Sequence, residues 1–337
     1  MAVRKMVYIY NGLGISDISL AMLTSALKRH LDPSFYNVCH ISPEDIIEGS
    51  WRNKTSLLAV GGGYDLGFIK ALTSSGIAQI RDFVVQGGQY LGICAGAYFA
   101  CEEIEFDRAG PLEVCGQRQL KFFPGVGIGP VYPGFVYNTE KGAVAAPLIY
   151  KTLDSILDFK TYFNGGCCFL PNEFSGMRNF RRKESFEVLT NSTHTLHMNS
   201  RNISTRCCSQ TKDESRQSSA CEKKGTDICE SSGNQKEERL SEKREKVDEI
   251  ACSLKAHDGV EVLGYYSGIV GNLPAIVRCD VGRGRAVLSG VHVEYCSHDL
   301  DQNDPDLARV LPELQAAQME NKTCFVSLLN HLDLKTV

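Results

Sequence analysis

The chain has 337 residues, of which 43% are hydrophobic and 23% are charged, a composition typical of a globular protein with a sizeable core. Its formal net charge of −4 excludes the strongly basic balance that marks nucleic-acid-binding proteins. The sequence contains no apolar run long enough to span a bilayer, and the apolar segment 6–10 is too short for the core of a signal peptide. We therefore expect a cytoplasmic protein that binds neither nucleic acid nor membranes.

Strands and helices are predicted to alternate through the first hundred residues. Short apolar segments at 6–10, 38–41 and 57–60 are typical of buried strands. Leucines at helical spacing follow the first segment, and a second helical pattern covers residues 69–86. This alternation predicts an α/β fold with a mostly parallel sheet and helices on both faces, which binds ligands at the carboxyl ends of its strands.

A glycine run at 61–63 follows the third apolar segment, at the sheet edge where ligands bind. Glycines let backbone N–H groups come close to a substrate, so Gly62 and Gly63 are candidates to hold an oxyanion. A tight turn between a strand and a helix needs the same residues. The pattern does not separate these two interpretations.

The sequence around Cys94 has the pattern of a nucleophile elbow. An apolar strand at 89–93 runs into Cys94, and helix-forming residues continue to Glu103. Gly92 and Gly96 flank the cysteine where this tight strand–turn–helix shape leaves no room for side chains. The N-terminus of the helix supplies N–H groups and a positive dipole end, and both favour a thiolate. The alternative is a buried cysteine at a helix start between two incidental glycines.

Two segments combine aromatic residues with glycine. Residues 120–137 are rich in Gly, Pro and aromatics with little periodicity, and residues 162–166 read Tyr-Phe-Asn-Gly-Gly. Irregular loop packing is the simplest prediction for both segments, although either could wall a pocket. We take Tyr98, Asn164 and Gly165 as candidate pocket residues.

Residues 198–255 differ in composition from the rest of the chain, being rich in Ser, Lys, Glu, Gln and Asn with almost no aromatics. Such a segment cannot bury enough apolar surface to offset its loss of chain entropy, so we expect it to be disordered. It lies between predicted strands at 187–190 and 260–266. We interpret it as an insertion in a single domain covering 1–337, because the strands beyond it must return to the cysteine elbow.

Fourteen cysteines are many for a chain of this size, and in a cytoplasmic protein we expect them to be reduced. Four of them lie in the polar segment without the regular ligand spacing of a zinc site: Cys207, Cys208, Cys221 and Cys229. We therefore expect no metal site.

The C-terminal part of the chain is predicted to supply a catalytic base. Residues 275–291 have the pattern of a β-hairpin, and residues 306–332 that of a helix. His292 and Glu294 follow the hairpin two positions apart, so an extended backbone would place both side chains on one face. An imidazole that faces Cys94, oriented by the carboxylate, would complete a nucleophile–base–orienter triad. A satisfied histidine at a strand end is the alternative.

Three motifs together resemble a known family. They are Gly-Ile-Cys-Ala-Gly-Ala-Tyr-Phe-Ala at 92–100, Tyr-Phe-Asn-Gly-Gly at 162–166 and Gly-Arg-Gly-Arg-Ala-Val-Leu-Ser-Gly-Val-His-Val-Glu-Tyr at 282–295. With them the chain resembles the N-terminal domain of eukaryotic biotin–protein ligases, within the class I glutamine amidotransferase-like superfamily. The resemblance implies a flavodoxin-like sheet with the cysteine elbow at its centre. It also implies that the cysteine, histidine and glutamate named above occupy the triad positions.

Two departures from the family pattern limit what the resemblance implies. Tyr98 stands where glutamine amidotransferases usually carry glutamine, so glutamine is not the expected substrate. Gly-Arg-Gly-Arg at 282–285 is similar to the segment with which biotin ligases cover biotinyl-adenylate, but residues 286–291 continue as a strand, and the only tryptophan, Trp51, lies far upstream. We expect the ligase catalytic module to be absent. Biotin and ATP would belong to that module, so no cofactor is assigned to this chain.

Two functions are consistent with these residues. For the biological role we favour a regulatory or interaction module in protein biotinylation. Its expected partners are a biotin ligase catalytic module or biotin-dependent carboxylases.

The second function is a cysteine amidohydrolase or acyl-transfer enzyme. Cys94 would attack a small acyl or amide substrate, and His292, oriented by Glu294, would act as general base and then acid. Three backbone N–H groups would hold the oxyanion, those of Gly62, Gly63 and Ala95. A redox-sensing cysteine-elbow protein is a third alternative, but such proteins generally lack the distant His-x-Glu pair.

Overall fold

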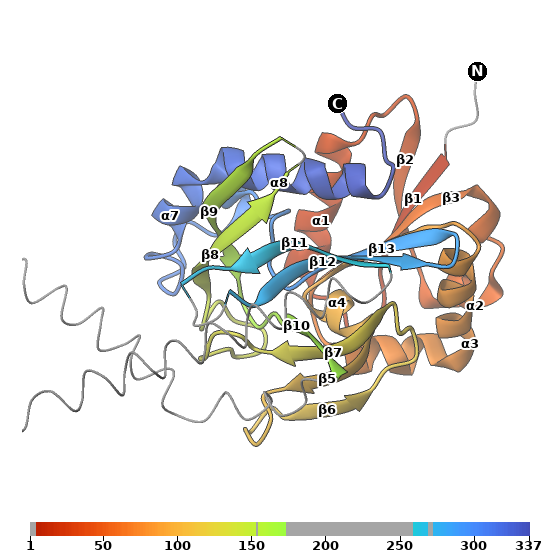
Figure 1. The fold of residues 1–337 in the computed structure, drawn as a ribbon, viewed down its shortest axis with the longest axis horizontal. Coiled ribbons are helices and arrows are strands. Elements are labelled where there is room, and N and C mark those ends of the chain that lie inside the picture. The colour runs from red at the N-terminus through yellow and green to blue at the C-terminus, as the bar shows by residue number, and fades with distance from the viewer. Residues whose placement is uncertain (1–4, 153, 173–258, 269–271) are drawn as a thin grey trace, which may run out of the picture. The chain divides into compact units, whose positions relative to one another are not determined.

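The computed structural model describes residues 5–152, 154–172, 259–268 and 272–337 (Figure 1). The insertion predicted at 198–255 and the strand predicted at 187–190 lie outside the described residues. Described residues on both sides of this gap belong to one compact unit. Within the described ranges, no helix is both long and apolar enough to cross a bilayer.

A nine-stranded sheet runs through the described residues, and its first half is parallel. β1 (Lys5–Tyr10) lies between β2 (Tyr36–Ile41) and β3 (Thr55–Val60), and β4 (Gln89–Ile93) lies between β3 and β13 (Gly284–Ser289). The aliphatic residues of β3, β4 and β13 are buried on both faces, as in other parallel sheets. β13 comes from near the end of the chain, and its Ser289 pairs with Ile93 directly before the cysteine elbow.

The second half of the sheet is antiparallel. It continues from β13 through β12 (Pro274–Val281), β11 (Val260–Tyr266), β8 (Val144–Lys151) and β9 (Ile156–Phe163). β12 and β13 form the predicted hairpin, and β11 coincides with the strand predicted at 260–266. The predicted α/β fold with its parallel sheet is confirmed, and the antiparallel half extends it.

Helices cover both faces of the parallel half (Figure 1). α1 (Asp17–His30) connects β1 to β2, and α3 (Asp65–Val85) connects β3 to β4. These two connections run in opposite directions across the sheet, so right-handed crossovers place the two helices on opposite faces. α2 (Pro43–Glu48) packs against α3, and α4 (Ala95–Phe99) follows β4.

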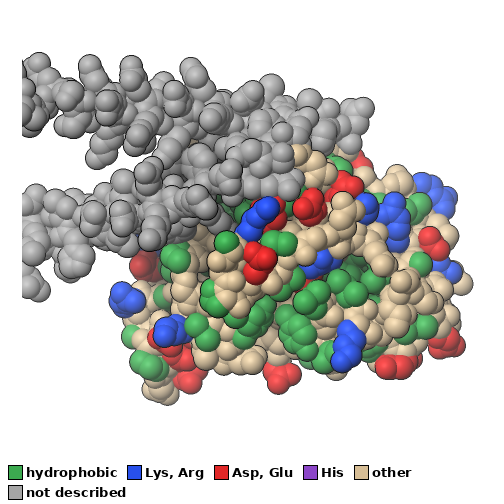
Figure 2. Space-filling view, turned by 90° about the horizontal axis from the view of Figure 1, so that it is seen from below, with side chains coloured by type: hydrophobic (Ala, Val, Ile, Leu, Met, Phe, Trp, Pro, Cys, Tyr) green, Lys and Arg blue, Asp and Glu red, His purple; other side chains and the backbone are tan. Residues whose placement is uncertain are grey.

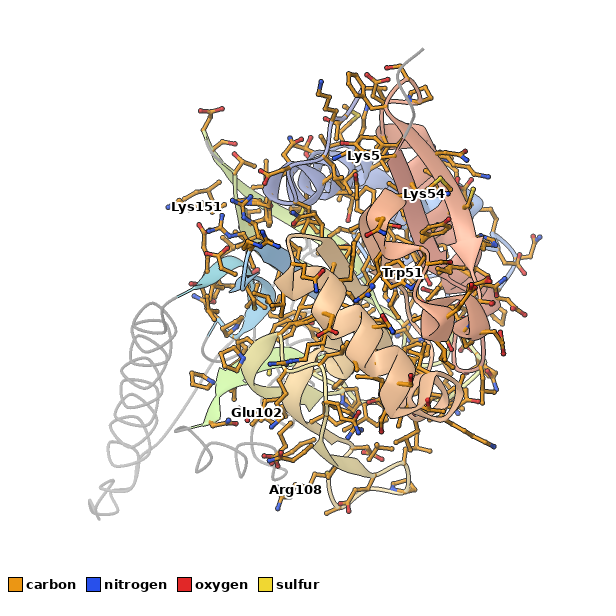
Figure 3. All side chains as sticks on the ribbon, turned by 90° about the vertical axis from the view of Figure 1, so that its right-hand side faces the viewer. Lys5, Trp51, Lys54, Glu102, Arg108 and Lys151 are labelled. Atoms are coloured by element: carbon orange, nitrogen blue, oxygen red, sulfur yellow. The ribbon has the colours of Figure 1, made fainter. Side chains whose placement is uncertain are left out.

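The buried Trp51 fixes the contact between α2 and α3 (Figure 3). Its ring lies 4.8 Å from that of Phe83 on α3, and its Nε1–H donates to the Ile46 carbonyl of α2 at 3.1 Å. The tryptophan therefore belongs to the core of the parallel half.

The C-terminal helix is broken, whereas the sequence pattern predicts one helix over 306–332. Two helices are present there, α7 (Leu311–Ala316) and α8 (Gln318–His331). Pro312 lies in the first turn of α7, where a proline costs no helical hydrogen bond. Ala317 leaves helical geometry with φ −102° and ψ 17°, which separates the two helices.

A second sheet of four strands corrects two predictions. Its strands are β10 (Cys168–Pro171), β7 (Phe123–Gly129), β5 (Cys101–Phe106) and β6 (Val114–Gln117). The helix predicted at 95–103 therefore ends at Phe99, and the segment 120–137, expected to be an irregular loop, contains a strand. β5 pairs with both β6 and β7, and this tertiary pairing overrides the local helix propensity of its glutamates.

The outer surface carries charged side chains of both signs. On the face drawn in Figure 2, Lys and Arg side chains are interspersed with Asp and Glu, and hydrophobic side chains gather between them. The whole chain has 36 Lys and Arg against 40 Asp and Glu, so neither sign dominates its composition.

Candidate active site

Cys94 stands at the junction of β4 and α4 in an unusual backbone conformation. Its φ of 51° and ψ of −108° lie outside the regions that non-glycine residues normally adopt, and such strain is concentrated at functional sites. The Cys94 N–H donates to the Ser289 carbonyl at 2.8 Å, which ties the turn to β13. A Cβ atom at Gly96 would lie 2.0 Å from the Val60 carbonyl oxygen, so the predicted need for glycine has a steric cause.

His292 and Glu294 form a buried pair after β13. His292 Nδ1 lies 2.8 Å from Glu294 Oε1, and the two side chains are 4% and 0% exposed. The strand ends at Ser289 and residues 293–294 form a turn, so the side chains meet through the turn and not through the extended backbone that the sequence predicts. The His292 N–H donates to the Tyr162 carbonyl at 2.9 Å, which holds this segment against β9.

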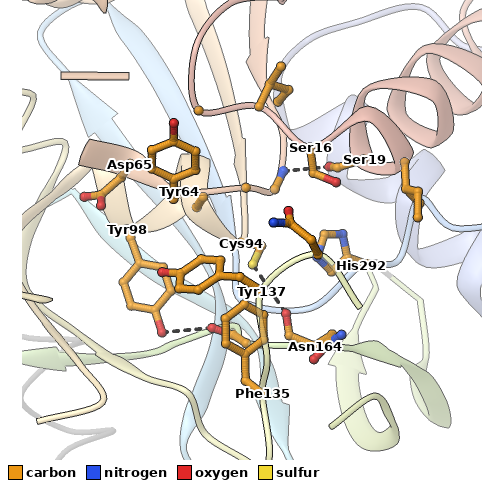
Figure 4. A pocket seen from close by; sticks show the side chains of 18 of the residues that line it. Ser16, Ser19, Tyr64, Asp65, Cys94, Tyr98, Phe135, Tyr137, Asn164 and His292 are labelled. Atoms are coloured by element: carbon orange, nitrogen blue, oxygen red, sulfur yellow. Dashed lines mark hydrogen bonds between the residues drawn. The ribbon is translucent and has the colours of Figure 1, made fainter. Parts of the chain in front are cut away.

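Cys94 and His292 lie beside each other at one cavity, although nearly two hundred residues separate them in the sequence (Figure 4). Burial lowers the pKa of His292, but the Glu294 carboxylate and the neighbouring Cys94 raise it more, to about 10. At neutral pH the imidazole is therefore protonated beside the thiol.

A cavity of about 460 Å³ opens at Cys94, a size that suits a small organic ligand. Its lining includes the other candidate residues that the sequence indicated: Gly62, Gly63, Ala95, Tyr98, Asn164, Gly165 and His292. Glu294 is not part of the lining and contacts the cavity only through His292. The structure thus brings all the candidate residues together at one place.

The three predicted oxyanion donors are not equivalent. The Gly62 N–H donates to Ser19 Oγ at 2.6 Å, so it is already engaged. Within the described residues, the structure records no acceptor for the N–H groups of Gly63 and Ala95, and both residues line the cavity beside Cys94. Two of the three donors are therefore free to bind an oxyanion in this conformation.

Four aromatic side chains line the cavity next to Cys94, and we call them the aromatic wall: Tyr98, Phe106, Phe135 and Tyr137. Neighbouring rings meet edge to face, with centroids 5.8 Å apart for Tyr98–Phe106, 5.6 Å for Phe106–Phe135 and 4.8 Å for Phe135–Tyr137. The Tyr98 O–H donates to the Gly165 carbonyl at 3.2 Å. A Cβ atom at Gly129 would lie 1.2 Å from the Tyr98 oxygen, so this ring depends on a glycine in β7.

Asn164 lies on the opposite side of the thiol from the elbow turn in Figure 4, with its carbonyl oxygen 3.8 Å from Cys94 Sγ. Its side-chain Nδ2 donates to the Thr139 carbonyl at 3.2 Å. Its Oδ1 is buried and has no hydrogen-bond partner among the described residues. The residue therefore positions the loop around the thiol and offers one acceptor.

Several cavity residues escaped the sequence analysis. Ser19 lies on α1, where only the leucine repeat stands out. Phe106 ends β5, of which residues 101–103 were expected to be helical and Phe106 itself lay beyond the predicted helix. Glu140 and Asp304 lie outside helices and strands, and no motif marks them. The aromatic texture of residues 120–137 was the one signal that pointed to Phe135 and Tyr137.

Three other buried cysteines are free thiols that do not line the cavity. Burial raises the pKa of Cys101, Cys167 and Cys279, so these side chains stay protonated. In the part of the chain that the structure describes, no three His, Cys, Asp or Glu side chains gather as metal ligands would. The four cysteines predicted not to bind metal, at 207–229, lie outside the described residues.

The chain is similar in sequence to known proteins. The family described as "Biotin-protein ligase, N terminal" matches residues 5–214 and 250–337. The biotin–protein ligase of Schizosaccharomyces pombe is 38% identical over 169 residues, which cover 50% of this chain but only 27% of that ligase. An uncharacterized protein of Chlamydia muridarum is 36% identical over 177 residues, which cover 51% of this chain and 67% of that protein.

A remote structural likeness accompanies the sequence matches. A glutamine amidotransferase of Thermotoga maritima superposes with a TM-score of 0.44 at 12% identity, covering 98% of this chain and 100% of that one. The family match spans most of the chain and includes the motifs at 92–100, 162–166 and 282–295, which confirms the resemblance inferred from them. The chain belongs to the family of biotin–protein ligase N-terminal domains.

Proposed function

We propose that the chain is a cysteine-dependent amidohydrolase or acyl-transfer module. The observation that carries this proposal is the buried His292–Glu294 pair beside the strained Cys94 at the cavity. A cysteine that only began a helix would need neither a strained backbone nor a buried imidazole and carboxylate behind it. The free N–H groups of Gly63 and Ala95 beside the thiol support the same conclusion.

The proposed reaction has two steps. The Cys94 thiolate attacks the carbonyl carbon, and protonated His292 gives its proton to the leaving nitrogen or oxygen as that atom departs. The acyl group remains on Sγ as a thioester. Neutral His292 then takes a proton from water or an acceptor amine, which attacks the thioester and releases the acid or a new amide. Glu294 holds the ring of His292 throughout.

An acyl-transfer assay with phenyl thioacetate tests the proposal. We expect thiophenol release and an acetyl group on Cys94, detected by peptide mass spectrometry. Cys94→Ala should lower the rate by about a thousandfold or more, because no other group replaces the nucleophile. Cys101→Ala, which removes a buried thiol that does not line the cavity, is the matched control. Unchanged turnover in Cys94→Ala would overturn the proposal.

We infer a role in protein biotinylation as a second function, because the family and the S. pombe relative are both named for biotin–protein ligases. The chain would act on, or together with, a ligase catalytic module or a biotin-dependent carboxylase. We expect the purified chain to change the rate of biotin transfer when it is added to a separate ligase module and an acceptor protein. No effect in that assay would remove this role and leave the acyl-transfer chemistry untouched.

We also propose that residues 282–285 do not form a ligase site, because their backbone and side chains are already held in place. Gly282 has a φ of 61° in the turn between β12 and β13, and the Arg283 N–H donates to the Val85 carbonyl at 2.9 Å. Arg285 lies in β13, 2.7 Å from Asp333. A turn held in this way is not free to close over an adenylate. Biotin transfer by the chain alone, with biotin, ATP and magnesium, would contradict the proposal.

A further inference from the structure

Apart from His292, whose charge is paired with that of Glu294, the charged residues that line the cavity are carboxylates. They are Asp17, Asp65, Glu140 and Asp304, and the described lining contains no Lys or Arg. Arg118 neutralises Asp65 in a buried ion pair. Among the described residues, the other three carboxylates have no ion-pair partner. The lining therefore contrasts with the outer surface, where both signs are interspersed (Figure 2).

Two of these carboxylates, Glu140 and Asp304, line the same cavity as His292. Glu140 accepts a hydrogen bond from the Tyr162 O–H, and the Tyr162 ring packs 5.6 Å from that of His292. Burial raises the pKa of Glu140, and the charges of Asp304 and Asp306 add to that effect, whereas the Tyr162 hydrogen bond and the charge of His292 oppose it. A bound cation would relieve the repulsion between these neighbouring carboxylates.

The aromatic wall adds a second, independent feature that suits a cation. In Figure 4 the rings of Tyr98, Phe135 and Tyr137 lie together on one side of Cys94. The faces of aromatic rings attract ammonium groups, most strongly where water is excluded, and carboxylates next to aromatic rings recur in sites for organic cations. An anionic ligand would gain nothing from the ring faces and would be repelled by the carboxylates, while the charge of His292 is already paired with that of Glu294.

We propose that the cavity selects a substrate with an organic ammonium group, held by Glu140, Asp304 and the aromatic wall while its carbonyl faces Cys94. The inference deepens the proposed acyl-transfer function and rests on it for turnover, but the cation preference is also measurable without turnover. Carboxylate-bearing small molecules are disfavoured in the same cavity.

Charged thiol reagents test the preference directly at Cys94. The full chain is treated with 2-(trimethylammonium)ethyl methanethiosulfonate or with sulfonatoethyl methanethiosulfonate, and the modification of Cys94 is followed by peptide mass spectrometry. The ratio of the cationic rate to the anionic rate at Cys94 is divided by the same ratio measured with 2-mercaptoethanol as the thiol. This division removes the difference in intrinsic reactivity between the two reagents. We expect a normalised preference for the cation of about tenfold or more. A normalised ratio near one would overturn the proposal.

Variants of the carboxylates locate the effect. The double variant Glu140→Gln, Asp304→Asn keeps the shapes of both side chains, and we expect it to lose most of the preference. Asp158→Asn, which removes an exposed carboxylate of β9 that does not line the cavity, should leave the ratio unchanged. A full preference in the double variant would overturn the assignment, and thermal unfolding would show whether each variant is folded.

Turnover of two matched thioesters separates this proposal from the proposed function. Acetylthiocholine carries a quaternary ammonium, and S-(3,3-dimethylbutyl) thioacetate has the same shape without the charge. We expect the cationic ester to react with a kcat/KM about tenfold higher. Equal turnover would overturn the cation inference and support the acyl-transfer function. If the thiol reagents show the cation preference but neither ester is turned over, the cation inference is supported and the acyl-transfer function is overturned.

Discussion

The side of the cavity that carries Cys94 and His292, which we propose to be catalytic and call the catalytic side, is built differently from the aromatic wall. Cys94 and His292 follow two neighbouring parallel strands, β4 and β13, whose register sets Ser289 against Ile93. The aromatic wall comes from α4, from the end of β5 and from the segment between β7 and β8. The first side is therefore set by backbone pairing in the main sheet, and the second by ring packing between segments of the smaller sheet and its loops.

A substitution at the turn after Cys94 should disrupt the catalytic side, and we expect it to cause the largest loss of stability. Gly96→Ala places a Cβ atom 2.0 Å from a backbone carbonyl of β3, which cannot move without disturbing the sheet. We expect a loss of about 3 kcal/mol in the free energy of unfolding, measured by urea denaturation. Gly116→Ala is the control, because its Cβ meets no atom within 4 Å and only its φ of 129° opposes the change. Equal losses in the two variants would show that the contact with β3 is not the cause.

A change at Gly129 should break the aromatic wall and leave the elbow intact. Gly129→Ala drives a Cβ atom into the Tyr98 ring, so the ring must move, and we expect a loss of about 2 kcal/mol in stability. The alkylation rate of Cys94 by iodoacetamide should stay within about threefold of that of the parent protein. Adding Tyr98→Leu, which shortens the clashing side chain, should restore part of the stability. A Cys94 that lost its reactivity would show that the two sides are not independent.

The candidate residues on the side of Cys94 were visible in the sequence because that side depends on local patterns. The glycines around Cys94, the alternation of strands and helices, and the hairpin before His292 each have a physical cause that short segments reveal. The pairing of His292 with Glu294 was expected for the wrong geometric reason, since a turn and not a strand joins them.

The aromatic wall was largely hidden from the sequence because it depends on long-range packing. β5 reads as the continuation of a helix until its pairing with β6 and β7 is known. Gly129 looks like one of several loop glycines, and its role becomes visible only beside Tyr98. Glu140 and Asp304 carry no motif at all, and the fold alone brings them to the cavity.

The pH dependence of stability sharpens the view of the catalytic side. Folding favours protonated His292, whose pKa is about 10 in the folded chain against about 6.5 when unfolded. This contribution is fully present below about pH 6.5 and is lost as the pH rises through about 10. Glu294→Gln removes the carboxylate charge that raises the pKa of His292 in the folded chain. The unfolding free energy should therefore fall less steeply between these pH values, with a slope that changes by the equivalent of up to about one bound proton. The same slope in Asp158→Asn and Glu294→Gln would contradict this.

The smallest expected effect concerns Ser19, which joins α1 to the glycine loop behind the catalytic groups. Its Oγ accepts the Gly62 N–H at 2.6 Å, so Ser19→Ala leaves a buried donor without a partner. We expect a loss of about 1 kcal/mol in unfolding free energy. The control is Ser16→Ala, because the Ser16 side chain lines the same cavity but makes no capping hydrogen bond to α1. If Gly63 and Ala95 are the oxyanion donors, phenyl thioacetate turnover should stay within about twofold of the parent rate. A tenfold fall without a change in Cys94 alkylation would instead place the Gly62 peptide, held by Ser19, in the oxyanion site.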